Sequence, residues 1–383
     1  MLACQYDAPG TPWNGTFKVT AEEPDPPTDA EEWVHYDPNW RQFVGCILTM
    51  IVSDHRDALR PELVARIESA LERCVAGEPA TRIPRWYTNP NLMHAWLSAR
   101  IGDPAGDARR RMIVDRFDRH GDVDEYNSPT YDGVDLMALG LWVTFPPNPR
   151  FATDGARLLA RLGERISRLY HPGLRAVCGP YTRAYGVDLD RYVSFLGMWW
   201  AMAGEATLPV DLSATTDHAH DLSFAPVLER LSDAVLPHLE PTDGARSHEQ
   251  RFGPVTATSV LGTDSMIGAE TGRRGTFSRD QYVPLVAHWH GPARVESIAL
   301  YVDDTTQVDA TARSPTHATA RVWSEAGEVV AYAAGTEARR AADLLATDTE
   351  PAVRDSGRHR SPVELRWPAG SSVELTLDLS SRR

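Results

Sequence analysis

Hydrophobic residues recur at two different spacings along the chain, and the spacing changes near residue 245. Before this point, apolar positions follow one another at intervals of three and four, which is typical of helices with one buried face. After it, short segments alternate apolar and polar positions and are rich in β-branched residues, which is typical of strands. The sequence therefore predicts a helical part and then a β part, with the boundary between Pro241 and His248.

The pattern predicts eight helices and seven strands. Helices are expected over Trp40–Ser53, Pro61–Ala76, Asn91–Arg100, Ala108–Phe117, Val134–Val143, Asp154–Tyr170, Asp190–Ala203 and Ala225–Leu236. Strands are expected over Val255–Val260, Tyr282–Trp289, Val295–Val302, Ala320–Trp323, Val329–Ala333, Val363–Trp367 and Val373–Leu377. The expected fold class is α+β, with a Pro-rich arm over 1–30 that is a surface strap or partly disordered, helical hairpins over 31–245, and an antiparallel β-sandwich over 246–383.

The composition argues against nucleic-acid-binding and membrane-spanning classes of protein. A chain of 383 residues is long enough for two domains. The net charge of -14 argues against nucleic acid as a partner, because binding to phosphates depends on clustered Lys and Arg. No apolar run reaches the roughly 18 residues that span a bilayer, and the first residues lack a basic start and an apolar core. We therefore expect no membrane partner and a cytoplasmic location.

Two loops combine the residue types that carry chemistry. One runs from Glu125 to Asp135 and the other from His171 to Asp188, and each leads into an expected apolar helix. Both contain Pro and Gly together with aromatic and charged side chains, and the first also contains the amide of Asn127. Since the two loops have the same character, we expect them to line one cleft from both sides.

Three short motifs in these regions carry a resemblance to a known group of enzymes. They are the Asn and Tyr of Tyr126–Tyr131, the His, Tyr, Arg and Tyr series from His171 to Tyr185, and the segment Phe277–His290. With helical hairpins followed by a β-sandwich, the chain resembles the toroid polysaccharide lyases, namely the heparinase II/III-like, alginate-lyase-like and uronyl-epimerase-like enzymes. The resemblance implies an (α/α) toroid over 31–245 and a Tyr or His as base and acid, with Asn, His or Arg neutralising a substrate carboxylate.

The residues themselves fit β-elimination beside a uronate, which requires a neutralised carboxylate, a base for the C5 proton and an acid for the leaving oxygen. Asn127 or Arg183 is expected to meet the carboxylate, and Tyr185 is expected to transfer the proton together with His171. A guanidinium beside a phenol stabilises the phenolate, and Arg183 and Tyr185 alternate in an extended segment, so both can face one side. The expected catalytic residues are Tyr185, Arg183, His171, Tyr181, Asn127, Tyr131 and Asp188.

A third polar and aromatic loop, from Trp86 to Asn91, precedes another expected helix. Aromatic rings offer flat faces to sugar C–H groups, and amides bond sugar hydroxyls. The expected substrate-binding residues are Trp86, Tyr87, Asn89, His94, Asp132, Arg279 and Gln281. The expected partner is an oligosaccharide or polysaccharide.

Two other functions stay open. A glycoside hydrolase would use two carboxylates as acid and base, drawn from Glu125, Asp132, Asp135 and Asp188. A non-catalytic protein would bind carbohydrate without turnover. The loops also have purely structural interpretations, since Asn127 and Ser128 are typical helix caps.

Metal and cofactor chemistry has weaker support. His288 and His290 lie on one strand face and would need a third ligand to bind a metal, and the chain contains no GxGxxG, Walker A, GxSxG or HExxH motif. No cofactor or metal is expected. Cys178 lies inside the second loop, where its thiol is either functional or simply packed.

Overall fold

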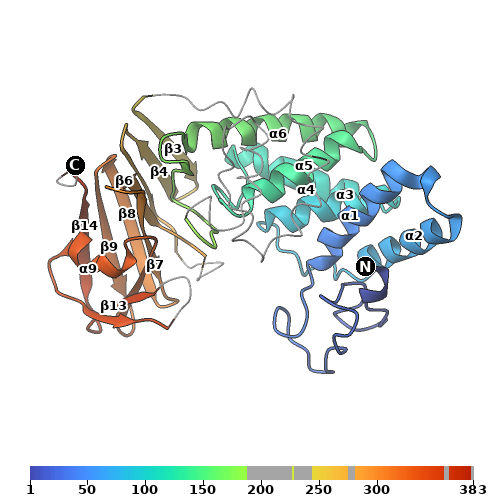
Figure 1. The fold of residues 1–383 in the computed structure, drawn as a ribbon, viewed down its shortest axis with the longest axis horizontal. Helices are drawn as coiled ribbons and strands as arrows, with labels where there is room; N and C mark the ends of the chain where they lie inside the picture. The colour runs from blue at the N-terminus through green and yellow to red at the C-terminus, as the bar shows by residue number, and fades with distance from the viewer. Residues whose placement is uncertain (188–226, 228–243, 275–280, 358–361, 381–383) are drawn as a thin grey trace. The chain divides into compact units, whose positions relative to one another are not determined.

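The computed structural model describes residues 1–187, 227, 244–274, 281–357 and 362–380 (Figure 1). Its long helices are α1 (Trp40–His55), α2 (Pro61–Ala76), α3 (Thr88–Arg100), α4 (Ala105–His120), α5 (Asp132–Thr144) and α6 (Pro149–Leu169). The short helices are η1 (Leu2–Cys4), η2 (Arg56–Ala58), η4 (Ala338–Arg340) and α9 (Ala341–Leu344). The protein is thus a mixed α+β chain in which helices precede antiparallel sheets, and this part of the predicted fold class is confirmed.

The strands form three antiparallel sheets. A small hairpin pairs β1 (Tyr170–His171) with β2 (Ala176–Val177). An eight-stranded sheet has the order β12-β13-β10-β7-β6-β5-β4-β3, and a four-stranded sheet has the order β11-β14-β9-β8. Their bounds are β3 Arg246–Phe252, β4 Val255–Leu261, β5 Ser265–Thr271, β6 Leu285–His290, β7 Val295–Val302, β8 Thr306–Ser314, β9 His317–Ser324, β10 Val329–Ala334, β11 Leu345–Thr347, β12 Ala352–Asp355, β13 Val363–Trp367 and β14 Ser372–Asp378.

The chain folds as two compact units. The first contains Met1–Asp124 and Asp135–Leu159. The second contains Glu125–Val134 together with the described residues of 160–187 and of 244–380. Both loops that the sequence singles out, 125–134 and 171–187, therefore belong to the unit that carries the sheets.

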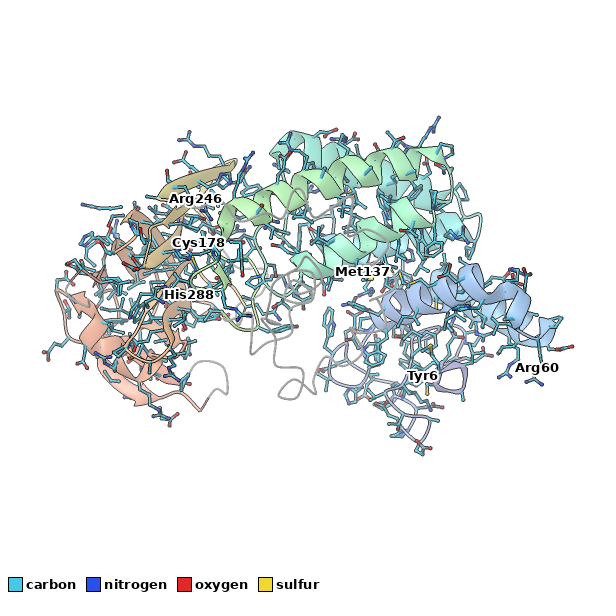
Figure 2. The ribbon with its side chains drawn as sticks, turned by 45° about the horizontal axis from the view of Figure 1, so that its top comes forward. Tyr6, Arg60, Met137, Cys178, Arg246 and His288 are labelled. Atoms are coloured by element: carbon cyan, nitrogen blue, oxygen red, sulfur yellow. The ribbon has the colours of Figure 1, made fainter. Side chains whose placement is uncertain are left out.

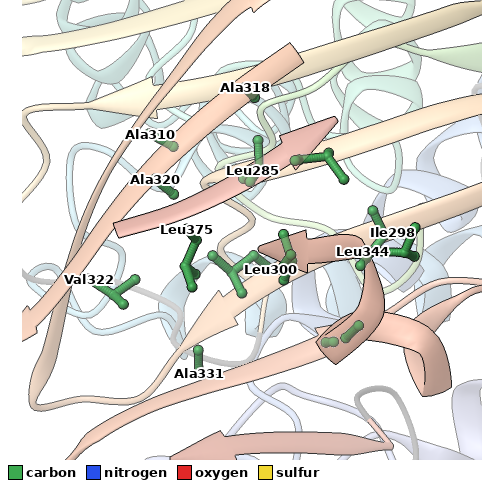
Figure 3. Packing of buried hydrophobic residues seen from close by; sticks show 14 of the residues in the cluster. Leu285, Ile298, Leu300, Ala310, Ala318, Ala320, Val322, Ala331, Leu344 and Leu375 are labelled. Carbon is green, nitrogen blue, oxygen red and sulfur yellow. The ribbon is translucent and has the colours of Figure 1, made fainter. Parts of the chain in front are cut away.

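One apolar core contains residues from both large sheets. Leu285, Leu300 and Ala331 come from the eight-stranded sheet, and Val322 and Leu375 come from the four-stranded sheet (Figure 3). Every second residue of these strands contributes to this core, as expected for the two-residue period of a strand.

The opposite face of the eight-stranded sheet is buried as well. The alternate residues Val286, Ala299, Tyr301, Val330, Tyr332 and Ala334 form a second cluster there. This cluster also contains Tyr181, Ala184 and Val187. The second polar loop therefore covers part of this sheet face.

The predicted elements agree with the structure where the hydrophobic period is regular. Helix α2 and strands β7 and β13 have the predicted bounds, and α3, α4 and α6 begin three to five residues earlier than predicted. The strands β1, β2, β3, β5, β8, β11 and β12 were not predicted. Strands β3 and β12 carry polar or exposed side chains, and β5 is buried on both faces, so none of these three shows a regular alternation of apolar and polar residues. The expected helices over 190–203 and 225–236 lie outside the described residues, apart from position 227.

The N-terminal arm differs from the predicted surface strap, because several of its aromatic side chains are buried. Tyr6 and Trp13 are buried and pack with Tyr36, and Arg41 donates a hydrogen bond to the Asn14 carbonyl at 2.9 Å. The arm gains this anchor because its aromatic rings bury enough apolar area to offset the cost of ordering a Pro-rich segment.

None of the helices among the described residues combines the length and the apolar composition that a membrane crossing requires.

The shared core leads to a stability prediction. Leu375 is 1% exposed between the two sheets, so Leu375→Ala should lower the free energy of unfolding by about 2–5 kcal/mol. Glu374→Ala is the matched control, because the neighbouring side chain on β14 is exposed. It should change stability by less than about 0.5 kcal/mol. Urea unfolding followed by circular dichroism measures both, and equal losses would contradict the shared core.

Candidate functional site

The sequence predicts that the two polar loops lie close together, and their segments 126–130 and 178–185 do lie side by side in the second unit. The hydrogen bonds between them include Thr182 Oγ1 to Tyr126 O (2.7 Å), Asn127 Nδ2 to the carbonyls of Cys178 (2.7 Å) and Pro180 (2.8 Å), Ser128 Oγ to Arg183 O, and Tyr185 N to Thr130 Oγ1 (3.1 Å). Short polar side chains thus replace a regular strand ladder, and they fix the position of each loop against the other.

The second loop is also bound to the eight-stranded sheet. Tyr181 and Val283 exchange backbone hydrogen bonds of 3.1 and 2.9 Å. A Cβ atom at Gly268 of β5 would lie only 1.8 Å from the carbonyl carbon of Gly179, so the glycine permits this close approach. Ser259 of β4 donates to the Gly179 carbonyl at 2.5 Å. The loop is therefore held on both sides.

Arg183 is the centre of the site. Its Nε donates to Gln281 Oε1 at 2.7 Å, and its Nη1 donates to Glu125 Oε1. Its Nη2 donates to the Tyr131 hydroxyl at 3.1 Å, and the guanidinium lies 4.1 Å from the centroid of that ring. The Glu125 side chain is fully buried and that of Arg183 is 8% exposed, so the carboxylate offsets a charge that would be costly to bury alone.

The two phenols of the site form a pair. The Tyr131 hydroxyl donates to the Tyr185 oxygen at 2.8 Å, and the two rings are tilted with centroids 5.8 Å apart. Because Arg183 donates to the Tyr131 oxygen, the proton of Tyr131 is directed at Tyr185. Both tyrosines are partly exposed, so the chain of donors from Arg183 ends near solvent.

A second ion pair lies at the start of α5. Arg165 donates to both carboxylate oxygens of Asp132, at 2.6 and 2.9 Å, and its guanidinium lies 5.1 Å from the Tyr126 ring centroid. Asp132 is fully buried. The bidentate pair joins α5 to α6. Asp132, which we expected to bind sugar, therefore has a structural partner instead.

His171 does not belong to the tyrosine pair. Its Nδ1 accepts from the Leu174 backbone N–H at 3.1 Å, so Nε2 carries the proton and donates to the Gly262 carbonyl at 2.7 Å. Burial lowers the pKa of this imidazole. Both ring nitrogens are occupied by backbone, and His171 holds the turn between β1 and β2. The expected role of His171 beside Tyr185 therefore has no support in this geometry.

Tyr181 and Asn127 are buried within the loops. The Tyr181 hydroxyl donates to the Val177 carbonyl, and its side chain is fully covered. Asn127 has a φ of 54° and is also fully covered, and its amide nitrogen donates to two backbone carbonyls. The amide that we expected to meet a substrate carboxylate instead holds the two loops together.

The third polar loop lies in the first unit. Trp86 stacks on Tyr87 with ring centroids 5.6 Å apart, and the Tyr87 hydroxyl accepts from Asn39 Nδ2 at 3.0 Å. Asn89 and His94 are buried, and burial together with the charge of a neighbouring arginine lowers the pKa of His94 to about 4. All four of these expected sugar contacts belong to the first unit, whereas the tyrosine pair belongs to the second.

Two expected site residues, Asp188 and Arg279, lie outside the described residues. Gln281 is described and holds Arg183 rather than facing solvent. Sequence reasoning missed Arg165 as a partner of Asp132. The sequence does contain a signal for a buried partner of Arg165. Leu158, Leu162 and Leu169 define one apolar face of α6, and Arg165 lies on this face. A charge on a buried face requires a partner.

The two histidines of β6 differ in their surroundings. His288 is buried with its Nε2 3.0 Å from the Val187 carbonyl oxygen, whereas His290 is exposed at the end of the strand. Within the described ranges no group of three metal-ligating side chains occurs.

The loops lead to a prediction for Asn127, whose φ of 54° is costly for residues with a Cβ atom. Asn127→Ala should lower the free energy of unfolding by about 2–4 kcal/mol, because two buried carbonyls lose their donor and the strain remains. Asn127→Gly loses the same donor and relieves the strain, so it should be more stable than the alanine variant by about 1 kcal/mol. Urea unfolding compares them, and an alanine variant at least as stable as the glycine variant would refute the strain argument.

The fully buried Cys178 is predicted to be chemically inert. Burial raises the pKa of its thiol to about 12, so at pH 8 the thiolate is scarce. Iodoacetamide at pH 8 should label the half-exposed Cys4 in the folded protein and label Cys178 only after denaturation. Peptide mass spectrometry reads both sites, and labelling of Cys178 at the rate of Cys4 would contradict its burial.

Comparison with known proteins places the chain in a family. The family model described as a domain of unknown function (DUF8769) matches residues 1–233, which is more than half of the chain. No curated protein matches the sequence. The match ends shortly before the first strand of the large sheets, so it covers most of the predicted helical part. The chain belongs to the family of the domain of unknown function DUF8769.

Proposed function

We propose that the protein is a carbohydrate-active carbon-oxygen lyase that cleaves an oligosaccharide by β-elimination next to a uronate. The observation that carries the proposal is the hydrogen-bonded pair of Tyr131 and Tyr185, partly exposed and supported by the buried Arg183. Elimination requires a proton-transfer group beside a positive charge, and this arrangement supplies both. The wider fold that accompanies this proposal is an (α/α) toroid with a β-sandwich, as the family resemblance implies.

In the proposed reaction, Tyr185 reacts as the phenolate, and its oxygen takes the proton from C5 of the uronate. The electron pair of the broken C–H bond forms the C4=C5 double bond, and the C4–O bond breaks. The leaving oxygen takes a proton from the tyrosine pair, so the net reaction consumes no water. The charge of Arg183 stabilises the phenolate and the enolate-like intermediate.

The roles within the pair follow from the contacts. Arg183 is held by Glu125 and Gln281, so its third contact, with Tyr131, has a fixed direction. Tyr131 then orients Tyr185 through the 2.8 Å hydrogen bond. Tyr185 is the proposed catalytic residue, and it shares a proton with Tyr131 through their hydrogen bond. Arg183, in place of Asn127, is the proposed group that binds the substrate carboxylate.

The hydrolase alternative has less support from the geometry. Of its candidate carboxylates, Glu125 is paired with Arg183 and Asp132 with Arg165, and both are fully buried. A buried carboxylate that is bound by a guanidinium is not placed to protonate a leaving oxygen or to activate a water. Asp135 is also buried, and Asp188 is outside the described residues.

The proposal predicts the effect of removing one phenol oxygen. Tyr185→Phe keeps the packing of the ring and deletes the proton-transfer group, so turnover should fall about 10²- to 10⁴-fold with folding unchanged. Turnover is measured on uronate-containing oligosaccharides as the absorbance of the conjugated unsaturated product. Tyr6→Phe is the matched control, since Tyr6 is a buried tyrosine of the other unit and should keep full activity.

A second variant separates elimination from hydrolysis. Asp188→Asn should leave elimination largely intact, because no carboxylate takes part in the proposed proton transfer. If Asp188→Asn abolishes turnover, Tyr185→Phe retains it, and reducing ends appear without the absorbance of an unsaturated product, then the protein is a hydrolase. Tight binding of the oligosaccharide without any turnover would instead indicate a carbohydrate-binding protein.

A further inference from the structure

A buried polar cluster in the first unit contains more positive than negative charge. Glu78 is the centre of the cluster, with a fully buried side chain. Arg82 donates to both of its oxygens, at 2.5 and 2.8 Å, and the fully buried Arg41 lies 3.6 Å from it. One carboxylate therefore serves two guanidinium groups.

Arg109 brings a third guanidinium to this cluster without a carboxylate of its own. It donates to Asn91 Oδ1, and it forms no ion pair within the described part of the chain. One of its five N–H groups is used in this way. Burial lowers the pKa of Arg109, the charge of Arg82 acts in the same direction, and Glu78 opposes them. A half-buried guanidinium without a close counter-charge is costly in a folded protein.

His94 presents a further donor beside Arg109, because His94 and Asn91 are three residues apart on the same face of α3. Gln42 Nε2 donates to Glu78 Oε2 at 3.0 Å and lies 3.4 Å from His94 Nδ1. Since Glu78 can only accept, the second N–H of this amide points at Nδ1. The proton of the neutral imidazole is therefore on Nε2.

Gln42 also leaves one acceptor without a partner. The residue is fully buried, and its Oε1 has no hydrogen bond among the residues that the structure describes. Flipping the amide would set Oε1 against the Glu78 carboxylate, so the assignment of its two ends is determined by this contact. Such an acceptor suits a ligand that carries a hydroxyl or N–H group.

The other charged groups near the cluster do not cancel its excess of positive charge. Asp37 acts on Arg82 and Arg41, but burial raises the pKa of its carboxyl. Asp103 acts weakly on His94, and its carboxylate accepts the Ala105 backbone N–H. Among the described residues, Glu78 and Asp103 act on Arg109 and His94 without forming an ion pair with either.

We infer that Arg109 and His94 bind an oxyanion, a carboxylate or phosphate group of a small hydroxylated ligand, at the N-terminal end of α3. The guanidinium and the imidazole Nε2–H supply charge-assisted hydrogen bonds. The Oε1 atom of Gln42 accepts from a hydroxyl group of the same ligand. This site lies within the first unit and does not depend on the lyase proposal for the tyrosine pair.

The test compares binding of D-glucuronate, inorganic phosphate and D-glucose to the full chain by calorimetry at constant ionic strength. We expect glucuronate or phosphate to bind, and the better of the two identifies the source of the oxyanion, whereas glucose should not bind measurably. Arg109→Met should weaken anion binding at least about tenfold, as expected for the loss of charge-assisted hydrogen bonds. Arg66→Met removes an exposed arginine of α2 and should leave binding unchanged.

Stability distinguishes a binding role from a structural one. If Arg109 has a binding role, the Arg109→Met variant should unfold without anion at the same temperature as the unmodified chain or at a higher one. The reason is that the substitution removes a poorly compensated charge. Added anion should raise the unfolding temperature of the unmodified chain and of Arg66→Met only. A loss of stability in Arg109→Met together with unchanged anion binding would overturn the inference.

A measurement on the unmodified chain covers the case in which the variant does not fold. The imidazole resonance of His94, assigned by its loss in His94→Gln, reports its pKa in an NMR titration. A bound anion stabilises the imidazolium, so saturating anion should raise this pKa from about 4. No shift with either anion, or an equal shift with glucose, would refute the site.

Discussion

The site of the second unit depends on one buried charge. A guanidinium is tolerated in a protein interior only when its hydrogen-bond donors and its charge are both compensated. Arg183 meets this requirement through Glu125, Tyr131 and Gln281, which come from segments 58, 52 and 98 residues away along the chain. The position of each of these segments is therefore linked to the others through a single side chain.

The loop that carries Arg183 is rigid because it is bound on both sides. Asn127 and Ser128 of the first loop donate to its backbone carbonyls, and backbone pairing at Val283 binds it to the larger sheet. Figure 2 labels Cys178, Arg246 and His288 in this region. Arg246 donates to the carbonyls of Arg168 in α6 and Tyr170 in β1. A rigid support of this kind keeps the tyrosine pair in one geometry, which proton transfer requires.

The two units differ in whether their buried arginines have carboxylate partners of their own. In the second unit, Arg183 and Arg165 each face a carboxylate at hydrogen-bond distance. In the first unit, Glu78 is shared by Arg41 and Arg82, and Arg109 remains without such a partner. Compensated charges stabilise a fixed arrangement, whereas an uncompensated one stores free energy that a ligand of opposite charge can release. This contrast separates the proposed catalytic geometry from the proposed oxyanion site.

The sequence by itself determined that helices precede the large sheets, because the hydrophobic period is a local property of each segment. It also identified the two polar loops, since their composition is unusual wherever they fold. It did not determine which polar groups pair. Asn127 bonds to backbone rather than facing solvent, Asp132 pairs with Arg165, and His171 holds a turn. Only the tertiary structure decided these partners, because each contact joins residues far apart in the chain and depends on which side chains become buried together.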